Sequence, residues 1–303
     1  MNPQDQPTLG ALMALATAQL KQAGCDTARL DARLLLANAC HVDASRIMAW
    51  PEDPVDSVKA AAFLEMIHRR ALREPVSRIL GQRDFWRHSF KITADTLDPR
   101  PDSETLVEWA IAQAGNFTRP DLVDFGTGTG CLLLSVLGDV ADSFGLGVDI
   151  SAGAVQCATG NAVALGLDQR CQFVVSDWDR DLDAQTKTGG FDIMLSNPPY
   201  IAHSEMAGLE PEVRDFDPFG ALSDGADGLG AYRILAGVAA RLVRPSGWVL
   251  FEIGRGQHEV VCSLLEQQGF ESVQYRRDLG GIIRCVGGQK PRSSHFNVSF
   301  LPE

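Results

Sequence analysis

Apolar residues in the first third of the chain recur at the spacing of amphipathic helices. After Thr8, a residue type that often caps a helix, they fall at Leu9, Leu12, Met13, Ala16 and Leu20. The spacing recurs in residues 30–35 and 58–67, and Pro75 ends the last of these helices because proline lacks a backbone N–H. We therefore expect residues 1–80 to form a small helical bundle.

Residues 81–103 are interpreted as a hairpin and a linker. The stretch from Phe85 to Ile92 has the pattern of two short strands. Pro99-Arg100-Pro101 then excludes a regular helix interior, because proline also restricts the residue before it. The chain has 303 residues, enough for two domains at roughly 100–200 residues each, and we place their boundary in this stretch.

From residue 104 to residue 288 the pattern changes to short apolar strands separated by helical segments. The expected strands are residues 122–125, 144–150, 171–175, 191–196 and 248–253. This alternation is typical of the α/β class, with a doubly wound, mostly parallel sheet covered by helices on both faces. Ligands of such sheets bind beyond the carboxyl ends of the strands. Residues 289–303 show no period and are expected to form a tail.

Composition narrows the classes of function. The chain carries 27 Lys and Arg against 39 Asp and Glu, and its net charge of −12 disfavours general binding to nucleic acid or to an anionic membrane. No apolar run approaches the roughly 18 residues of a bilayer span, so we expect no membrane-spanning segment. The first basic residue is Lys21, so the start resembles neither a secretory signal nor a transit peptide. These features predict a cytoplasmic protein.

Cysteine spacing argues against a metal site. The seven cysteines are scattered along the chain without a single C-x-x-C pair. In a cytoplasmic chain such a set is typical of free thiols, and the spacing that binds zinc is absent. We expect neither disulfides nor a bound metal.

Chemistry-bearing residues follow three consecutive strands of the expected sheet. The first strand leads into Gly126-Thr127-Gly128-Thr129-Gly130 at the start of a helix, where glycines admit a close ligand and free N–H groups attract an anion. The next strand ends at Asp149, a carboxylate able to accept hydrogen bonds from both hydroxyls of a ribose. The third leads into Asp177-Trp178, which suits an adenine. Their order along one edge favours a nucleoside ligand over separate roles as turn, helix cap and core.

The fourth strand leads into the most informative motif, Asn197-Pro198-Pro199-Tyr200. The two prolines fix the backbone and remove two donors, which leaves the Asn197 side-chain oxygen and nearby carbonyls as acceptors for an NH₂ group. Methylation of an amide or aromatic amine develops positive charge on nitrogen, and acceptors that hold both N–H bonds stabilise that charge. Tyr200 can stack on a flat amide. The alternative interpretation of this tetrapeptide is a rigid Asn-Pro turn.

A methyl donor consistent with these loops is S-adenosylmethionine. Its methionine end would lie at residues 126–130, its ribose at Asp149 and its adenine by Trp178. The third glycine of the loop comes one position too early for the dinucleotide pattern G-x-G-x-x-G, and Cys131 takes its place. This departure disfavours a nicotinamide oxidoreductase.

At these residues the chain resembles the class I S-adenosylmethionine-dependent methyltransferases, and more narrowly the HemK/PrmC family. That family methylates the Gly-Gly-Gln glutamine of class 1 peptide chain release factors, the proteins of translation termination. The resemblance extends to about Gly288 and includes Glu74-Pro75-Val76, residues 99–104, and Phe251-Glu252-Ile253-Gly254 with Gly256-Gln257. It implies a seven-stranded sheet that includes a final antiparallel strand. It also implies an N-terminal helical domain that helps to dock the release factor.

The resemblance also implies roles for individual residues. Cofactor contacts carry over to Gly126, Thr127, Gly128, Thr129, Gly130, Asp149, Asp177, Trp178 and Asn197. Substrate contacts carry over to Arg100, Asn197, Pro198, Pro199 and Tyr200, of which Asn197, Pro198 and Tyr200 are assigned to catalysis. The implied product is S-adenosylhomocysteine, and no metal takes part. One departure is Asp98, which stands where the family usually has an aliphatic residue.

Three alternative functions remain open at this point. A sister branch that methylates a glutamine of a large-subunit ribosomal protein shares Asn-Pro-Pro-Tyr and differs mainly in its N-terminal region. DNA adenine-N6 methyltransferases also carry the tetrapeptide, but residues 201–230 hold seven acidic residues against Arg214 alone and would repel a duplex. A binding protein that has lost catalysis would not need an acceptor-lined amine pocket.

A basic stretch precedes the sheet. Residues 66–91 contain seven Lys and Arg against Glu74 and Asp84. We interpret this stretch either as a docking surface for a protein partner, through Arg69, Arg70 and Arg73, or as a solvated face.

Overall fold

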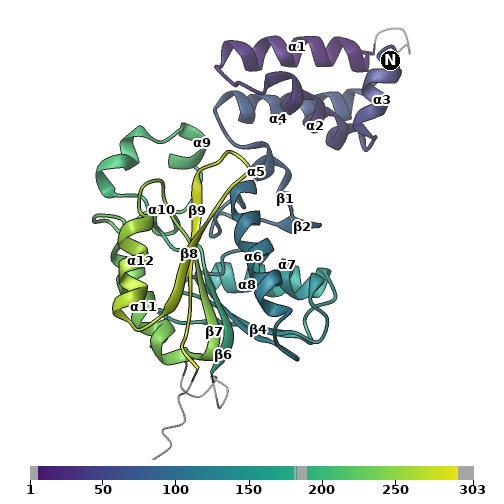
Figure 1. Cartoon of the computed structure of the whole chain (residues 1–303). Helices are drawn as coiled ribbons and strands as arrows, with labels where there is room; N and C mark the ends of the chain where they lie inside the picture. Colours follow the sequence, from purple (N-terminus) through teal and green to yellow (C-terminus); the bar gives the residue numbers. More distant parts are fainter. Residues whose placement is uncertain (1–5, 181, 183–189, 293–303) are drawn as a thin grey trace, which may run out of the picture. The chain divides into compact units, whose positions relative to one another are not determined.

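The computed structural model describes residues 6–180, 182 and 190–292 (Figure 1). The chain forms two compact units. The first comprises Met1–Gln82 together with Leu209–Asp217, and the second comprises Arg83–Gly208 and Pro218–Glu303. The expected tail lies outside the described residues from residue 293 onward. Gln289, its first expected residue, instead ends a strand because it pairs with Trp248.

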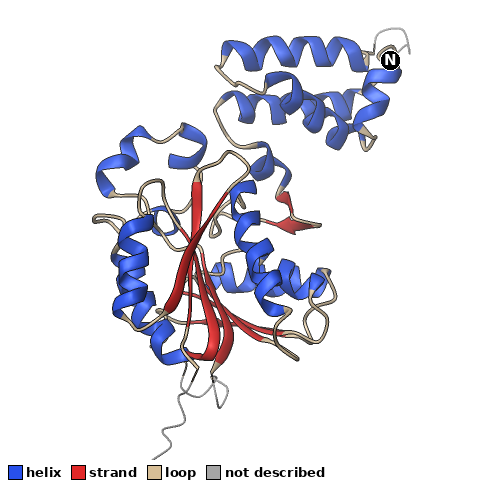
Figure 2. Cartoon of the chain, viewed as in Figure 1, coloured by secondary structure: helices blue, strands red, loops and turns tan. Residues whose placement is uncertain are grey.

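The first unit is the expected helical bundle (Figure 2). Its helices are α1 (Leu9–Gln22), α2 (Ala28–Cys40), α3 (Ala44–Ala49), α4 (Ser57–Ala71), α5 (Val76–Leu80) and α9 (Pro211–Arg214). Side-chain caps begin two of them: Thr8 accepts a hydrogen bond from the backbone N–H of Ala11, and Asp56 accepts from those of Val58 and Lys59. The core is built from one face of each long helix and includes Leu20, Leu35, Leu36, Phe63 and Ile67.

The second unit contains a seven-stranded sheet in the order β5-β4-β3-β6-β7-β9-β8. The strands are β3 (Asp121–Phe125), β4 (Phe144–Asp149), β5 (Cys171–Val175), β6 (Phe191–Ser196), β7 (Val243–Glu252), β8 (Glu271–Arg277) and β9 (Ile283–Gln289). The first five in spatial order pair in parallel, whereas β9 pairs antiparallel with both β7 and β8. These pairings confirm the mostly parallel sheet and its late antiparallel strand.

Helices cover both faces of this sheet, as Figure 2 shows. They are α6 (Glu104–Ala114), α7 (Cys131–Asp139), α8 (Ala152–Ala164), α11 (Gly230–Leu242) and α12 (His258–Gln267), with shorter turns at η2 (Pro101–Ser103), η3 (His203–Gly208) and α10 (Phe219–Leu222). Alternate strand residues enter different cores. Val123 and Met194 pack in one cluster with α11 and α12, whereas Leu122 and Ile193 pack in the other with α6 and α7. The doubly wound arrangement follows from this alternation.

The hairpin ahead of the sheet consists of β1 (Gln82–Phe85) and β2 (His88–Lys91). Trp86 lies in the turn between them with a φ of 55°. Asp98, the departure from the family pattern, is buried and lies 3.8 Å from the guanidinium of Arg83. A cationic partner therefore accounts for an acidic residue at this position.

Much of the charge of the basic stretch is balanced within the first unit. Arg70, Arg73 and Arg78 form ion pairs with carboxylates of residues 210–217. Arg69 pairs with Glu74. These pairs give Arg69, Arg70 and Arg73 internal partners, and the docking interpretation stays a prediction.

In the described ranges, all seven cysteines are free thiols. The same ranges contain no group of three or more His, Cys, Asp and Glu side chains placed to hold a metal ion. No helix among the described residues has the length and apolarity needed to cross a membrane.

Replacement of Trp109 by alanine tests the packing of the second unit. Trp109 is 1% exposed and packs against Trp248 with ring centroids 6.2 Å apart. We expect Trp109→Ala to lower the free energy of unfolding by about 3–5 kcal/mol, because the cavity adds to the lost burial. Denaturant titration measures this value, and Phe219→Ala, at a ring that is 53% exposed, is the control. A loss below about 1 kcal/mol at Trp109 would contradict the assigned core.

Candidate active site

The glycine loop lies between the end of β3 and the start of α7. Gly126, Gly128 and Gly130 all have positive φ angles, and Gly130 is the residue immediately before α7. At Gly130 an added Cβ would lie 3.1–3.3 Å from side chains of Leu134, Ala158 and Phe173, so a larger residue there would disturb the packing. At Gly128 an added Cβ would meet no atom within 4 Å. The space beside the loop is therefore open to a ligand.

Asp124, near the end of β3, stabilises this loop through Thr127. Its Oδ2 accepts a hydrogen bond of 2.8 Å from the Thr127 hydroxyl. Burial raises the pKa of the Asp124 carboxyl to about 7, against the lowering effect of that hydrogen bond. Asp124 is not among the site residues predicted from the sequence, although an acidic residue near the end of an apolar strand is a recognisable signal.

Asp149 is the last residue of β4 and faces the same loop. Its Oδ2 accepts from the backbone N–H of Gly128 at 2.9 Å, and its Oδ1 accepts from that of Ser151 at 2.9 Å. Each carboxylate oxygen keeps a further lone pair for a ligand hydroxyl. Ser151 is the residue that caps α8, through a hydrogen bond from Ala154, so the side-chain cap is not Asp149.

Asp177 and Trp178 follow β5 after one intervening residue, Ser176. Ser176 donates its backbone N–H to the carbonyl of Asp149 at 3.0 Å, which ties this turn to the end of β4. The Asp177 carboxylate pairs with Arg180 at 2.9 Å. Trp178 has a φ of 54° and is partly buried against the core that includes Val123 and Met194. The turn is thus in place beside Asp149, with Asp177 engaged locally and Trp178 partly in a core role.

Asn197 begins the Asn-Pro-Pro-Tyr motif beside the glycine loop. Phe125 and Ser196 are register partners of β3 and β6, so Gly126 and Asn197 follow neighbouring strand ends. The Asn197 carbonyl oxygen lies 3.9 Å from the position of a Cβ at Gly126. Its side-chain Nδ2 donates to the Ser103 hydroxyl at 3.4 Å, which leaves Oδ1 as an acceptor. Pro198 and Pro199 then contribute no N–H groups.

Tyr200 is held at both ends. Its hydroxyl lies 3.5 Å from Oε1 of Glu252, and its backbone carbonyl accepts from Nε2 of Gln257 at 2.9 Å. Gln257 also accepts from the backbone N–H of Gly254 at 2.9 Å, so it links two loops. Burial, followed by the nearby charge of Glu252, raises the pKa of Tyr200 far above its usual range. Tyr200 therefore remains a neutral phenol at physiological pH.

Glu252 lies fully buried at the end of β7. Burial raises the pKa of its carboxyl to about 7, while a hydrogen bond from Ser103 and the charge of Arg284 act in the opposite direction. Arg284 is itself paired with Asp102 at 3.0 Å and Asp278 at 3.1 Å. Glu252 and Gln257 belong to the motif of residues 251–257 but were not predicted as site residues. An acidic residue inside the apolar run 248–253 was the available signal for the first of them.

Arg100 completes the group of selected residues. It lies immediately before η2, the turn whose Ser103 hydroxyl accepts from Asn197. The structure therefore gathers the glycine loop, Asp149, Asn197 and Tyr200 at the carboxyl edge of the sheet, and Arg100 lies three positions before Ser103 in the chain.

Two domain families match the chain. The PrmC N-terminal domain matches residues 11–81, and the methyltransferase small domain matches residues 98–209. The first match covers the helical bundle, and the second covers the strands that carry the glycine loop and the Asn-Pro-Pro-Tyr motif. A catalytic domain of the methyltransferase type is therefore present.

Solved structures support the same fold. The catalytic domain of hMettl16, in complex with the MAT2A 3′UTR hairpin 6, matches with a TM-score of 0.56 at 17% identity. The match covers 74% of this chain and 81% of that one. At this identity the likeness establishes the class I methyltransferase architecture of the sheet and its helices.

Curated relatives establish the family. A release factor glutamine methyltransferase of Rhodospirillum rubrum is 45% identical over 92% of this chain and 84% of its own length. Another, from Cereibacter sphaeroides, is 42% identical over 91% of this chain and 96% of its own length. Both relatives span the helical unit as well as the sheet. The resemblance seen in the motifs is thereby confirmed, and the chain belongs to the HemK/PrmC family of release factor glutamine methyltransferases.

Proposed function

We propose that this enzyme transfers a methyl group from S-adenosylmethionine to the side-chain amide nitrogen of the Gly-Gly-Gln glutamine of class 1 release factors. The observation that carries the proposal is the adjacency of Gly126 and Asn197 at paired strand ends. A donor site and an amide-accepting turn thereby lie side by side in a chain of this family. The free thiols are in keeping with a cytoplasmic enzyme.

The residues present fit the proposed cofactor. The open space beside Gly128 and the remaining lone pairs of Asp149 suit a nucleoside with a charged amino-acid end. Residues 126–130 would hold the methionine end, Asp149 the ribose hydroxyls, and Asp177 and Trp178 the adenine. When bound, S-adenosylmethionine supplies an electrophilic methyl group on a sulfonium sulfur. No metal is part of this proposal.

The chain's own contribution is to hold the substrate nitrogen. Oδ1 of Asn197 and the carbonyls of the proline turn accept the two N–H bonds of the glutamine amide, which directs the nitrogen lone pair toward the donor. The same acceptors stabilise the positive charge that develops on nitrogen, until the methylated amide releases one of its two N–H protons to water. Tyr200, a neutral phenol fixed by Glu252 and Gln257, packs on the flat amide rather than removing a proton. Arg100 supplies positive charge at the rim for the substrate backbone.

The helical unit supports release factors over the alternative substrates. The branch that acts on a ribosomal protein differs mainly in its N-terminal region, and here residues 11–81 match the PrmC N-terminal domain. Residues 201–230 repel DNA less than their number of acidic residues indicates. Glu210, Glu212 and Asp217 form ion pairs with arginines of the first unit, which offset their charge. The ground for preferring release factors to DNA is therefore the family to which the chain belongs.

A labelling experiment tests the proposal as a whole. The protein is incubated with isotopically labelled S-adenosylmethionine and, in separate reactions, a release factor, a ribosomal protein and duplex DNA. We expect label on the release factor only, at the amide nitrogen of the Gly-Gly-Gln glutamine, as located by mass spectrometry. Label on another substrate, or on another atom, would contradict the proposal.

Replacement of Asn197 tests the amide-holding role. We expect Asn197→Ala to reduce kcat by about 10²–10³-fold, the usual cost of one lost oxyanion-type contact, with cofactor Kd changed less than about threefold. Steady-state kinetics and calorimetric titration measure the two values. Asn116→Ala, at an exposed asparagine after α6, is the matched control. Full activity in Asn197→Ala would exclude the role.

Replacement of Asp149 separates cofactor binding from catalysis. We expect Asp149→Ala to weaken S-adenosylmethionine about 10- to 100-fold, because two charge-assisted hydrogen bonds to the ribose are lost. The kcat at saturating cofactor should change much less. Calorimetry gives the Kd, and Asp168→Ala, at an exposed carboxylate, serves as control. An unchanged Kd would remove Asp149 from the cofactor site.

A further inference from the structure

Residues Leu209–Asp217, here called the strap, are continuous in sequence with the second unit but pack with the first. Eight residues, 201–208, separate Tyr200 from the strap, which ends immediately before Pro218, where the second unit resumes. Its carboxylates Glu210, Glu212 and Asp217 all pair with arginines of the first unit. The strap is therefore a piece of the helical unit inserted into the catalytic sequence.

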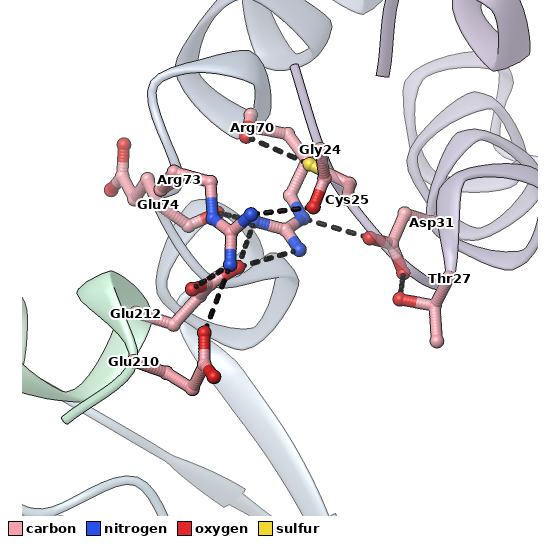
Figure 3. Close-up of polar contacts among 9 residues, drawn as sticks. All are labelled: Gly24, Cys25, Thr27, Asp31, Arg70, Arg73, Glu74, Glu210 and Glu212. Carbon is pink, nitrogen blue, oxygen red and sulfur yellow. Dashed lines mark hydrogen bonds and ion pairs between the residues drawn. The ribbon is translucent and has the colours of Figure 1, made fainter. Parts of the chain in front are cut away.

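Arg70 is the centre of the attachment (Figure 3). Its side chain is 7% exposed, and its Nε donates to Asp31 at 2.8 Å while Nη1 and Nη2 both donate to Oε1 of Glu212 at 3.1 Å. Asp31 is fixed in turn by a 2.8 Å hydrogen bond from the Thr27 hydroxyl. One buried cation thus joins α2, α4 and the strap.

Arg73 holds the other oxygen of Glu212. Its Nη2 lies 2.7 Å from Oε2 of Glu212 and 3.4 Å from Glu210, and its Nη1 donates to the carbonyl of Gly24, as Figure 3 shows. Arg73 has a φ of 73°, a left-handed conformation that is unfavourable for a side chain of this size. The surrounding contacts maintain this conformation, which directs the guanidinium at the strap.

A second ion pair holds the end of the strap. Arg78 and Asp217 are 2.6 Å apart, with side chains 7% and 0% exposed. Exposed ion pairs contribute little, but removal of one partner from a buried pair leaves an uncompensated charge. Although burial acts to raise it, hydrogen bonds from Arg73 and Arg70 keep the pKa of Glu212 below its usual value. Glu212 is therefore charged and engaged at physiological pH.

The chain between the motif and the strap is anchored at its start as well. Ile201 donates to the carbonyl of Leu222 and His203 to that of Ala226, both at 2.9 Å. The intervening η3 turn, His203–Gly208, has no buried residue. Its geometry consequently depends on its two ends, and the far end is the strap.

We propose that Glu212 is a positioning residue. Its contacts with Arg70 and Arg73 fix the far end of residues 201–208 and so determine the path of the chain that follows the Asn197–Tyr200 motif. The proposal rests on the proposed function. Presentation of the glutamine of a folded release factor beside the Asn197–Tyr200 motif depends on the position of residues 201–208. Binding of S-adenosylmethionine does not depend on it.

Glu212→Gln tests the proposal, because it removes the charge and keeps the volume. We expect kcat/KM for the folded release factor to fall about tenfold, chiefly through KM, with the Kd for S-adenosylmethionine unchanged within about twofold. Hydrogen exchange measured by mass spectrometry should increase in residues 201–217 and remain unchanged in β3 and β6. Glu210→Gln is the matched control, since Glu210 has a side chain 78% exposed and lies at 3.4 Å from Arg73.

Arg73→Gln is the second variant, for use if Glu212→Gln does not fold, because it leaves the Arg70–Glu212 contact in place. A smaller effect of the same kind is expected from it. If the wild-type enzyme methylates the release factor but both variants match Glu210→Gln in KM and exchange, the positioning role is overturned and the proposed function stands. If the wild-type enzyme does not methylate the release factor, the proposed function itself fails.

Discussion

The parallel pairing of β3 with β6 is the constraint on which the site depends. Its register sets Phe125 opposite Ser196, so the glycine loop and the Asn-Pro-Pro-Tyr turn leave the sheet as neighbours. A shift of one residue would turn the inward side chains of β6 toward the opposite core. The two hydrophobic cores therefore determine the chemistry at the edge, because they select the register that brings donor loop and acceptor turn together.

Around this junction, buried polar groups support the functional residues from behind. Ser103, Glu252 and Gln257 each contact a group of the Asn197–Tyr200 motif or lie within its electrostatic reach. A rigid acceptor set suits a reaction in which the substrate nitrogen is a poor nucleophile, since fixed dipoles need no reorganisation as charge develops. Under the proposed function, methyl transfer at this motif depends more on placement than on proton transfer.

Much of the fold was accessible from the sequence because its signals are local. Apolar periods located the three long helices of the first unit, α1, α2 and α4, and short apolar runs located β3, β4, β5 and β6 to within a residue or two at their ends. Apart from Arg100, the selected site residues lie at or shortly after the ends of those strands. The contacts that could not be predicted join residues that lie far apart in the sequence. Net charge counted in a window could not reveal that the basic and acidic stretches neutralise each other across 142 positions, from Arg70 to Glu212.

That separation has a consequence for how the chain is made. A ribosome delivers the amino-terminal helices well before residue 212, so a nascent bundle contains Arg70, Arg73 and Arg78 without their distant carboxylates. Domains generally fold as units during synthesis. The first unit, however, has all of its residues only after β3, β4, β5 and β6 of the sheet have been synthesised. Completion of the first unit is therefore coupled in time to synthesis of the second. An excised fragment ending at residue 82 would lack the carboxylates of residues 210–217 that pair with Arg70, Arg73 and Arg78, and Arg70 would keep its pair with Asp31.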